Sequence, residues 1–303
     1  MGVTPFEFGA QPPATEPLSW QDEPMRIDAQ VHAYERDHPG RPWTGFLHGP
    51  PEVTGDQLIA AMDSVGVDGA ILVSPWTLYR CDASYVIDVQ QAFPERIALS
   101  KPFDLLDGQV GDAVTAWAAS PGVVAARIMM TGSRRSPEEE VGIDAVCRAA
   151  AVSSLPVCVL AWGELDRLEA VVRRHPDTQF VLDHLGLPQP FEPPVPPDPF
   201  AGLPVVLALA GFPNLAIKVT GAATLSHQPC PFDDLWPHLE QVFNAFGLER
   251  CLWGTDWTRA VGLVTYKEAV DAFATTSRLS DSDREQLMAG SARRVFRWTP
   301  TRG

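Results

Sequence analysis

The sequence is poor in the features that mark several large classes of protein. It has 5 cysteines in 303 residues and no CxxC pair, so it predicts neither a disulfide framework nor a paired-cysteine zinc motif. No segment reaches the roughly 20 apolar residues of a membrane helix, and the first residues lack the basic start and apolar run of a secretory signal. We therefore expect a cytoplasmic protein with reduced thiols and no membrane partner.

Positive charge and nucleotide-binding motifs are also lacking. Lys and Arg total 23 against 38 for Asp and Glu, a formal net charge of −15. Nucleic acids bind basic surfaces, so this balance speaks against a nucleic-acid partner, although local Arg or Lys in a pocket could still bind a small anionic substrate. Neither GxGxxG nor GxxxxGK[ST] follows the first apolar run, which removes the usual reason to prefer a doubly wound open sheet.

What the sequence does contain is a regular alternation of short apolar runs and longer amphipathic stretches. The runs are apolar on both faces and rich in β-branched residues, which is typical of parallel strands covered on both sides. They occupy residues 25–32, 69–74, 96–103, 123–130, 155–161, 178–186, 215–221 and 249–257. Helices are predicted at 56–66, 82–93, 109–119, 137–152, 164–174, 203–212, 232–247, 265–276 and 280–296.

Eight strand–helix units favour a closed (β/α)8 barrel, the TIM-barrel architecture, because alternating strands and helices build parallel sheets with right-handed crossovers. An open doubly wound sheet is the competing architecture. We assign residues 25–303 to the barrel, which would be the catalytic domain. Residues 1–24 are rich in Pro and lack periodicity, so we expect them to form an extended arm.

Polar side chains lie where several apolar runs end. Active sites of these barrels form at the carboxyl ends of the strands, so such residues are candidates for chemistry. Gln30 and His32 are two positions apart and should share a face of their strand. Asp183 should face away from His184 and could pair with a helix, as a structural residue. The polar candidates are Gln30, His32, Lys101, Arg127, His184, Lys218 and Asp256.

Further candidates come from the loops that follow strands. Arg127 and Lys218 would suit an acidic substrate, since Arg in particular binds carboxylates through paired hydrogen bonds, but either could instead form an ion pair inside the barrel. We place Lys101 with them as a substrate-binding candidate. The residues expected to wall the substrate pocket are Trp43, His48, Trp76 and Trp257.

Taken together, these motifs resemble the amidohydrolase superfamily, and within it the amidohydrolase-2 group of lactonases and metal-dependent decarboxylases. The resemblance spans roughly residues 25–298 in unbroken order. It implies a distorted (β/α)8 barrel in which His32, His184 and Asp256 surround the chemistry, with Asp256 as the general base that activates water. The motifs are IDAQVH (27–32), RPW (41–43), FVLDHLG (180–186), IKVTG (217–221), ERCLWGTDW (249–257) and GSARRVF (290–296).

The sequence departs from this group where a metal would be held. Gln30 stands at the position of the first His in the group's HxH motif, and the fifth apolar run offers no His. A zinc site usually has three or four protein ligands, whereas the candidates are His32, His184 and Asp256. The cofactor expectation is therefore either none or one divalent metal, Zn²⁺ or Mn²⁺.

Three functions follow from this pattern. We favour a hydrolase that opens a small, carboxylated cyclic ester (a lactone) or a related metabolite, with Asp256 activating water. The first alternative is a metal-dependent, non-oxidative decarboxylase of an aromatic acid. The second is a catalytically inactive barrel that binds a ligand, supported by Gln30 alone. The expected partners are a small-molecule substrate and, because barrels of this kind often pair, a second copy of the chain.

Overall fold

The computed structural model describes residues 24–131 and 135–301. The predicted N-terminal arm, residues 1–24, lies outside the described residues except for Pro24. In the part of the chain that is described, no helix is long and apolar enough to cross a membrane.

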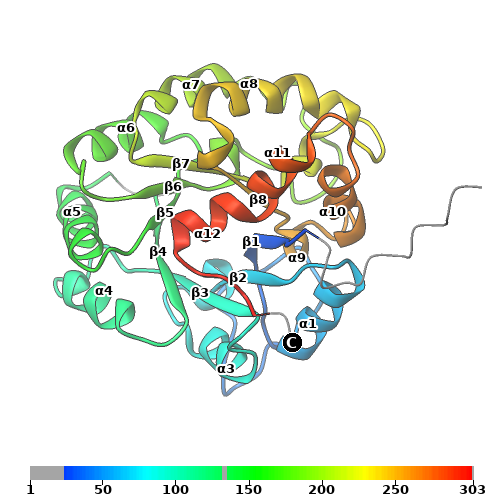
Figure 1. The fold of residues 1–303 in the computed structure, drawn as a ribbon. Coiled ribbons are helices and arrows are strands. Elements are labelled where there is room, and N and C mark those ends of the chain that lie inside the picture. Colours follow the sequence, from blue (N-terminus) through cyan, green and yellow to red (C-terminus); the bar gives the residue numbers. More distant parts are fainter. Residues whose placement is uncertain (1–23, 132–134, 302–303) are drawn as a thin grey trace, which may run out of the picture.

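Eight parallel strands form one sheet in sequence order, curved into a barrel with the helices outside it (Figure 1). This confirms the predicted (β/α)8 architecture over the open doubly wound sheet. Each strand falls inside one of the eight predicted apolar runs. The strands are β1 (Ile27–Val31), β2 (Gly69–Val73), β3 (Ile97–Pro102), β4 (Val123–Met129), β5 (Val157–Leu160), β6 (Phe180–Leu182), β7 (Leu215–Thr220) and β8 (Cys251–Gly254).

The helices also lie where the amphipathic stretches predicted them, and two short ones, α2 and α9, follow β2 and β8 directly. The last predicted helix, 280–296, is divided by a π-helical turn at Gln286–Gly290. The α-helices are α1 (Gly55–Ser64), α2 (Trp76–Tyr79), α3 (Ser84–Ala92), α4 (Val110–Ala118), α5 (Pro137–Val152), α6 (Leu165–Arg174), α7 (Leu203–Ala208), α8 (Trp236–Phe246), α9 (Trp257–Ala260), α10 (Tyr266–Ala274), α11 (Asp281–Glu285) and α12 (Ser291–Phe296).

A side chain bridges β1 and β8, where the barrel closes. The Asp28 carboxylate accepts the Thr255 backbone N–H at 2.9 Å and the Thr255 hydroxyl at 2.5 Å. Just above, the Asp256 N–H donates to the Gln30 carbonyl oxygen at 3.0 Å. Burial raises the pKa of Asp28 to about 6. These hydrogen bonds between Asp28 and Thr255 thus connect the first strand to the residue that precedes Asp256.

Two hydrophobic cores result from the barrel. The larger lies between strands and helices, and the smaller fills the inside of the barrel with residues such as Ala29, Val181 and Ala216. Helix α12, red in Figure 1, crosses the amino-terminal end of the barrel and adds Val295 and Phe296 to the inner core. Because α12 covers this end, we expect the substrate site at the carboxyl ends of the strands.

An irregularity in β1 decides which of its side chains face inward. Ala29 belongs to the inner core, whereas Val31 belongs to the outer one, so simple alternation does not hold between them. The pairing of β1 with β2 shifts register between Asp28 and Val31. Such a bulge re-aims the side chains that follow it, and here Gln30 and His32 both border the central cavity.

Three charged side chains fill the barrel above the inner core. Asp183, at the end of β6, accepts from Arg127 Nε at 2.8 Å and lies 2.9 Å from Lys218 Nζ. Burial by itself raises the pKa of Asp183, but Lys218 and Arg127 outweigh it and bring the pKa down to about 2. The expectation that Asp183 pairs with a helix was wrong. Val181 faces the inside of the barrel, so Asp183, two residues later, also points inward. There it forms ion pairs with Arg127 of β4 and Lys218 of β7, the pairs that the sequence analysis allowed as an alternative to substrate binding.

We predict that Asp183→Asn destabilises the fold by about 3–5 kcal/mol at neutral pH, because two buried cations lose their counter-ion. The stabilisation from the ionised carboxylate is present above its unfolded pKa of about 4 and is lost as the pH falls towards 2. The difference between variant and wild type in urea unfolding should therefore shrink over that range.

Asp166→Asn is the matched control, because Asp166 pairs with Arg135 at the exposed surface and its loss should cost less than about 1 kcal/mol. Equal destabilisation by the two substitutions would contradict the role given to Asp183.

Candidate active site

A cavity of about 80 Å³ opens at the carboxyl end of the barrel. Its lining divides into polar groups that come mainly from strand ends and an apolar wall that comes mainly from loops. The polar residues are Gln30, His32, Arg127, His184, Asp256, Arg259 and Thr77, and the apolar wall contains Leu47, Pro75, Trp76, Met129, Leu160, Trp162 and Phe191.

Asp256 lies at the floor of this cavity, fully buried, in the left-handed region at φ 53°. Its Oδ2 accepts from Arg259 Nε at 2.6 Å and lies 3.8 Å from His184 Nδ1. Its Oδ1 lies 3.3 Å from His32 Nε2 and has no hydrogen-bond partner among the described residues. Burial by itself raises the pKa of Asp256, but the Arg259 guanidinium outweighs burial and holds the pKa well below its usual range. Asp256 is therefore an ionised carboxylate with one oxygen left for a ligand.

The contacts of His32 fix the role of each ring nitrogen. Nδ1 lies 2.7 Å from the Val73 carbonyl oxygen. A carbonyl can only accept, so Nδ1 carries a proton and donates it. Nε2 is then the nitrogen that faces Asp256, and His32 and Asp256 present Nε2 and Oδ1 side by side.

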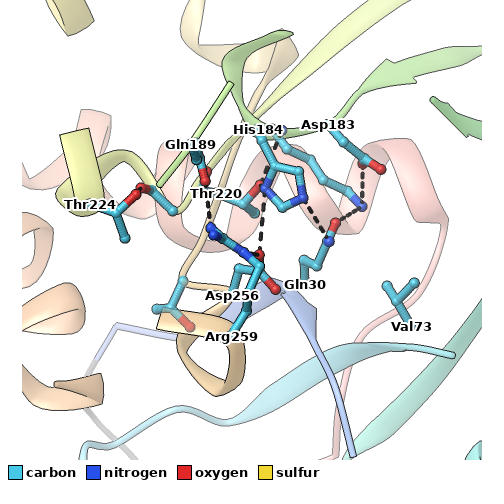
Figure 2. A network of polar contacts seen from close by, with 12 residues as sticks. Gln30, Val73, Asp183, His184, Gln189, Thr220, Thr224, Asp256 and Arg259 are labelled. Atoms are coloured by element: carbon cyan, nitrogen blue, oxygen red, sulfur yellow. Dashed lines mark hydrogen bonds and ion pairs between the residues drawn. The ribbon is translucent and has the colours of Figure 1, made fainter. Parts of the chain in front are cut away.

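Lys218 determines the state of His184 through Gln30. Lys218 Nζ donates to Gln30 Oε1 at 3.0 Å, so the amide nitrogen of Gln30 must face His184 Nε2, 3.0 Å away (Figure 2). His184 Nε2 accepts this hydrogen bond, and Nδ1 keeps the proton and donates to Thr220 Oγ1 at 3.0 Å. Burial lowers the pKa of His184 to about 3. The histidine is therefore neutral, with both nitrogens engaged.

Backbone geometry explains why Asp183 and His184, the two residues that follow β6, both point into the barrel. Asp183 is extended and points inward, and a continued strand would turn His184 outward. Instead, His184 and Leu185 have φ of 54° and 58°, and the backbone N–H of His184 donates to Thr220 Oγ1 at 3.3 Å. This turn swings the imidazole over Asp183 and into the cavity.

The structure brings together about half of the residues predicted for the site. Gln30, His32, Trp76, Arg127, His184 and Asp256 line the cavity. The remaining five predicted residues have other contacts. Lys218 is buried beneath the cavity on Asp183, Lys101 lies over the Phe103 and Trp117 rings, Trp43 contacts Tyr34 edge-on, Trp257 stacks on Tyr266, and His48 pairs with Glu192 near the rim.

Several lining residues were not predicted from the sequence. Arg259 lies three positions after Asp256, inside the short helix α9, and a basic residue there has no pattern that separates it from a surface arginine. Trp162 follows β5 and Phe191 lies in the loop after β6. The indole N–H of Trp162 is buried, and no acceptor for it is found among the described residues. Trp162 could have been predicted as a lining residue, because it lies just after the carboxyl end of β5.

The residues at the cavity do not fit a divalent metal. Gln30 occupies the lone pair of His184 Nε2, and Arg259 occupies Asp256 Oδ2. This leaves His32 Nε2 and Asp256 Oδ1 as donors, fewer than the three or four protein ligands usual for zinc. Within residues 24–131 and 135–301, no group of three or more His, Cys, Asp or Glu side chains is arranged to hold a metal. Arg127 and Lys218 also place positive charge near the cavity, and this charge would repel a divalent metal cation.

Two curated relatives are similar to parts of the chain. The L-fucono-1,5-lactonase of Burkholderia multivorans is 31% identical over 143 residues, which are 44% of this chain and 48% of that protein. The 4-sulfomuconolactone hydrolase of Rhizobium radiobacter is 25% identical over 233 residues, which are 72% of this chain and 68% of that protein. The aligned region thus spans about half of the first relative and about two thirds of the second.

Solved structures share the fold. An amidohydrolase from Burkholderia multivorans, crystallised with bound HEPES and separately with bound zinc, has a TM-score of 0.72 at 20% identity, covering 91% of this chain and 100% of that one. A 5-carboxyvanillate decarboxylase from Novosphingobium aromaticivorans, complexed with manganese, has a TM-score of 0.63 at 14% identity and covers 90% of this chain and 96% of that one.

A protein-family model with the description amidohydrolase, of the amidohydrolase-2 type, matches residues 9–298, which is nearly the whole chain. The barrel, the inward polar residues of β1, β6 and β8, and this match together show that the protein belongs to the amidohydrolase family of the amidohydrolase-2 type.

Proposed function

We propose that the protein hydrolyses a small lactone that carries a single carboxylate, and that it does so without a metal. The observation that carries this proposal is the Asp256 carboxylate, ionised at the cavity floor with Oδ1 free beside His32 Nε2. The names of the two relatives, a lactonase and a sulfomuconolactone hydrolase, support lactone hydrolysis as the reaction class.

The attacking water would lie on the cavity side of Asp256 Oδ1 and His32 Nε2, which are 3.3 Å apart, within hydrogen-bond distance of both atoms. Both atoms can accept a hydrogen from it, which turns an oxygen lone pair towards the substrate carbonyl. As the new C–O bond forms, the proton passes to Asp256 Oδ1. When the ring C–O bond breaks, Asp256 returns this proton to the departing ring oxygen, and the product is a hydroxy acid.

Gln30 is suited to polarise the carbonyl. Its amide has two N–H groups, and His184 takes one of them. The second is available to the carbonyl oxygen, where negative charge grows in the transition state. A lactone needs less assistance than an amide, because an alkoxide departs more readily than the nitrogen anion that an amide would expel if its nitrogen were not protonated. An uncharged donor set is therefore better matched to an ester ring than to a peptide or amide bond.

Arg127 is suited to hold the carboxylate of the substrate. Asp183 fixes its Nε, and neither Nη has an acceptor among the described residues although the side chain lines the cavity. A guanidinium held in this way offers two parallel N–H groups to a carboxylate. Asp183 is shared with Lys218, and Asp256 is matched by Arg259. One positive charge is left over on the Arg127 side, which favours a singly charged anion.

The alternatives account for less of the site. A metal-dependent decarboxylase, such as the manganese complex with the same fold, needs a donor set that Gln30 and Arg259 disrupt here. An inactive binding barrel gives no reason to keep a buried carboxylate with a free oxygen beside His32, since such a group is costly to bury.

We expect Asp256→Asn to lower kcat for lactone opening by about 10²- to 10⁴-fold, because the amide cannot take the proton of the water. Circular dichroism should show that the fold is retained, with a lower melting temperature because Arg259 loses its buried counter-ion. Asp233→Asn, at an exposed surface ion pair with Arg278, should leave turnover unchanged. Wild-type rates in Asp256→Asn would disprove the role of this carboxylate.

Arg127→Met should raise KM for a carboxylated lactone by about 10- to 100-fold, the value of a lost charge-assisted hydrogen bond. The KM for the same lactone with its carboxylate methylated should hardly change. Arg135→Met is the control on the exposed part of the following loop. An equal effect of Arg127→Met on both substrates would contradict carboxylate binding.

Elemental analysis of the purified protein, together with assays after EDTA treatment, tests the metal. We expect less than stoichiometric zinc and manganese, and lactone turnover that is unchanged by the chelator, because only two donors remain free. Activity that disappears with EDTA and returns with Zn²⁺ or Mn²⁺ would favour a metal enzyme instead.

A further inference from the structure

We propose that Arg259 is a positioning residue, which takes one oxygen of Asp256 so that the other is presented to the attacking water. This inference rests on the proposed function. Arg259 Nε donates to Asp256 Oδ2 at 2.6 Å, and the Arg259 backbone N–H donates to the Asp256 carbonyl oxygen at 3.1 Å. The side chain is 6% exposed, so water does little to weaken the pair.

The rest of the guanidinium is held from the other side. Nη2 donates to Gln189 Oε1 at 2.7 Å (Figure 2). Nη1 donates to the Pro190 carbonyl oxygen at 3.0 Å. The Phe191 ring lies against the guanidinium at 5.0 Å. Gln189 is itself fixed, because its Nε2 donates to the Thr220 carbonyl oxygen at 2.8 Å. Strand β7 and the loop after β6 therefore set the position of Arg259.

Gly221 leaves the space that this arrangement needs. Its φ is 68°, and a Cβ at this position would lie 2.2 Å from Gln189 Oε1 and 3.1 Å from Arg259 Nη2. Any other residue would push Gln189 away from the guanidinium. The contact between Gln189 and Arg259 thus depends on a glycine that directly follows β7.

Asp256 needs such an anchor because its carboxylate has one weakly restricted torsion. Rotation about χ2 of an aspartate is broad and roughly two-fold, so the carboxylate could otherwise turn away from His32. Among the described residues, Oδ1 has no hydrogen bond to hold it, and His184 Nδ1 is too far from Oδ2, at 3.8 Å, to do so. The Nε contact of Arg259 is the one that fixes the plane.

An arginine meets this demand and a lysine does not. Nε, Nη1 and Nη2 of one planar guanidinium contact three different acceptors. A lysine ammonium is a compact point charge on a flexible stem. A positive charge alone would keep Asp256 ionised. The planar guanidinium of Arg259 also links the orientation of the Asp256 carboxylate to Gln189 and Pro190.

The first test compares Arg259→Lys and Arg259→Ala with wild type on a lactone substrate. We expect kcat to fall by about 10- to 100-fold in both, the usual effect of a small misplacement of a reacting group. KM should stay within about twofold, because the substrate carboxylate is held by Arg127 and not by Arg259. Added guanidinium chloride should restore part of the kcat of Arg259→Ala.

Arg250→Ala is the matched control. Arg250 lies at the opposite end of β8, where its guanidinium donates to the carbonyl oxygens of Phe246, Ala210, Phe212 and Leu215. Its loss should lower the melting temperature without changing kcat, and guanidinium should have no effect on its rate. A rise in KM at unchanged kcat in Arg259→Lys would overturn the proposal and make Arg259 a substrate contact.

A second test does not depend on turnover. In a crystal structure of Arg259→Lys, we expect the Asp256 carboxylate to turn so that Oδ1 no longer faces His32 Nε2, compared with the 3.3 Å of the parent chain. An unmoved carboxylate would overturn the positioning role even if the wild type opens lactones. If the wild type opens none, the proposed function fails, and the carboxylate orientation still decides the role of Arg259.

Discussion

The carboxylate of Asp183 lies buried at the centre of the barrel with the Lys218 ammonium on one oxygen and the Arg127 guanidinium on the other. Lys218 can only donate, so its contact with Gln30 must be to the amide oxygen, and this fixes the orientation of the Gln30 amide. The Gln30 N–H then faces His184 Nε2 and sets the tautomer of that histidine. One ion-pair cluster thus decides the protonation of a histidine on the cavity surface. Without Asp183, neither cation could be buried there at acceptable cost.

The same cluster gives the cavity its electrostatic character. A catalytic metal supplies positive charge close to the reacting carbonyl. In the proposed metal-free reaction, the positive charge would come from fixed guanidinium and ammonium groups. Asp183 and Gln30 hold Lys218, and Asp256 holds Arg259. Replacement of the expected first histidine by Gln30 is consistent with this, because an amide can face a lysine and a histidine at once. The same substitution completes the hydrogen-bonded chain from Lys218 through Gln30 to His184.

The barrel could be predicted from the sequence because its strands are buried on both faces and its helices are amphipathic, so each element carries its own pattern. The polar residues could be placed at strand ends for the same reason. The shared direction of Gln30 and His32 could be predicted from their spacing, but the bulge in β1 could not. The left-handed backbone that turns His184 inward beside Asp183 could not be predicted either. Arg259 could not be found, since a buried arginine in a short helix looks like a surface one in sequence.

These local irregularities explain how fold and chemistry depend on each other. His184 and Asp256 adopt left-handed backbone at φ 54° and 53°, which costs about 1–3 kcal/mol for residues other than glycine. Contacts within the site compensate for this cost: the His184 N–H bonds Thr220, and the Asp256 N–H bonds the Gln30 carbonyl. The hydrogen bonds that hold the strained turns also align the side chains. The barrel therefore cannot relax these turns without moving the groups on which the proposed hydrolysis depends.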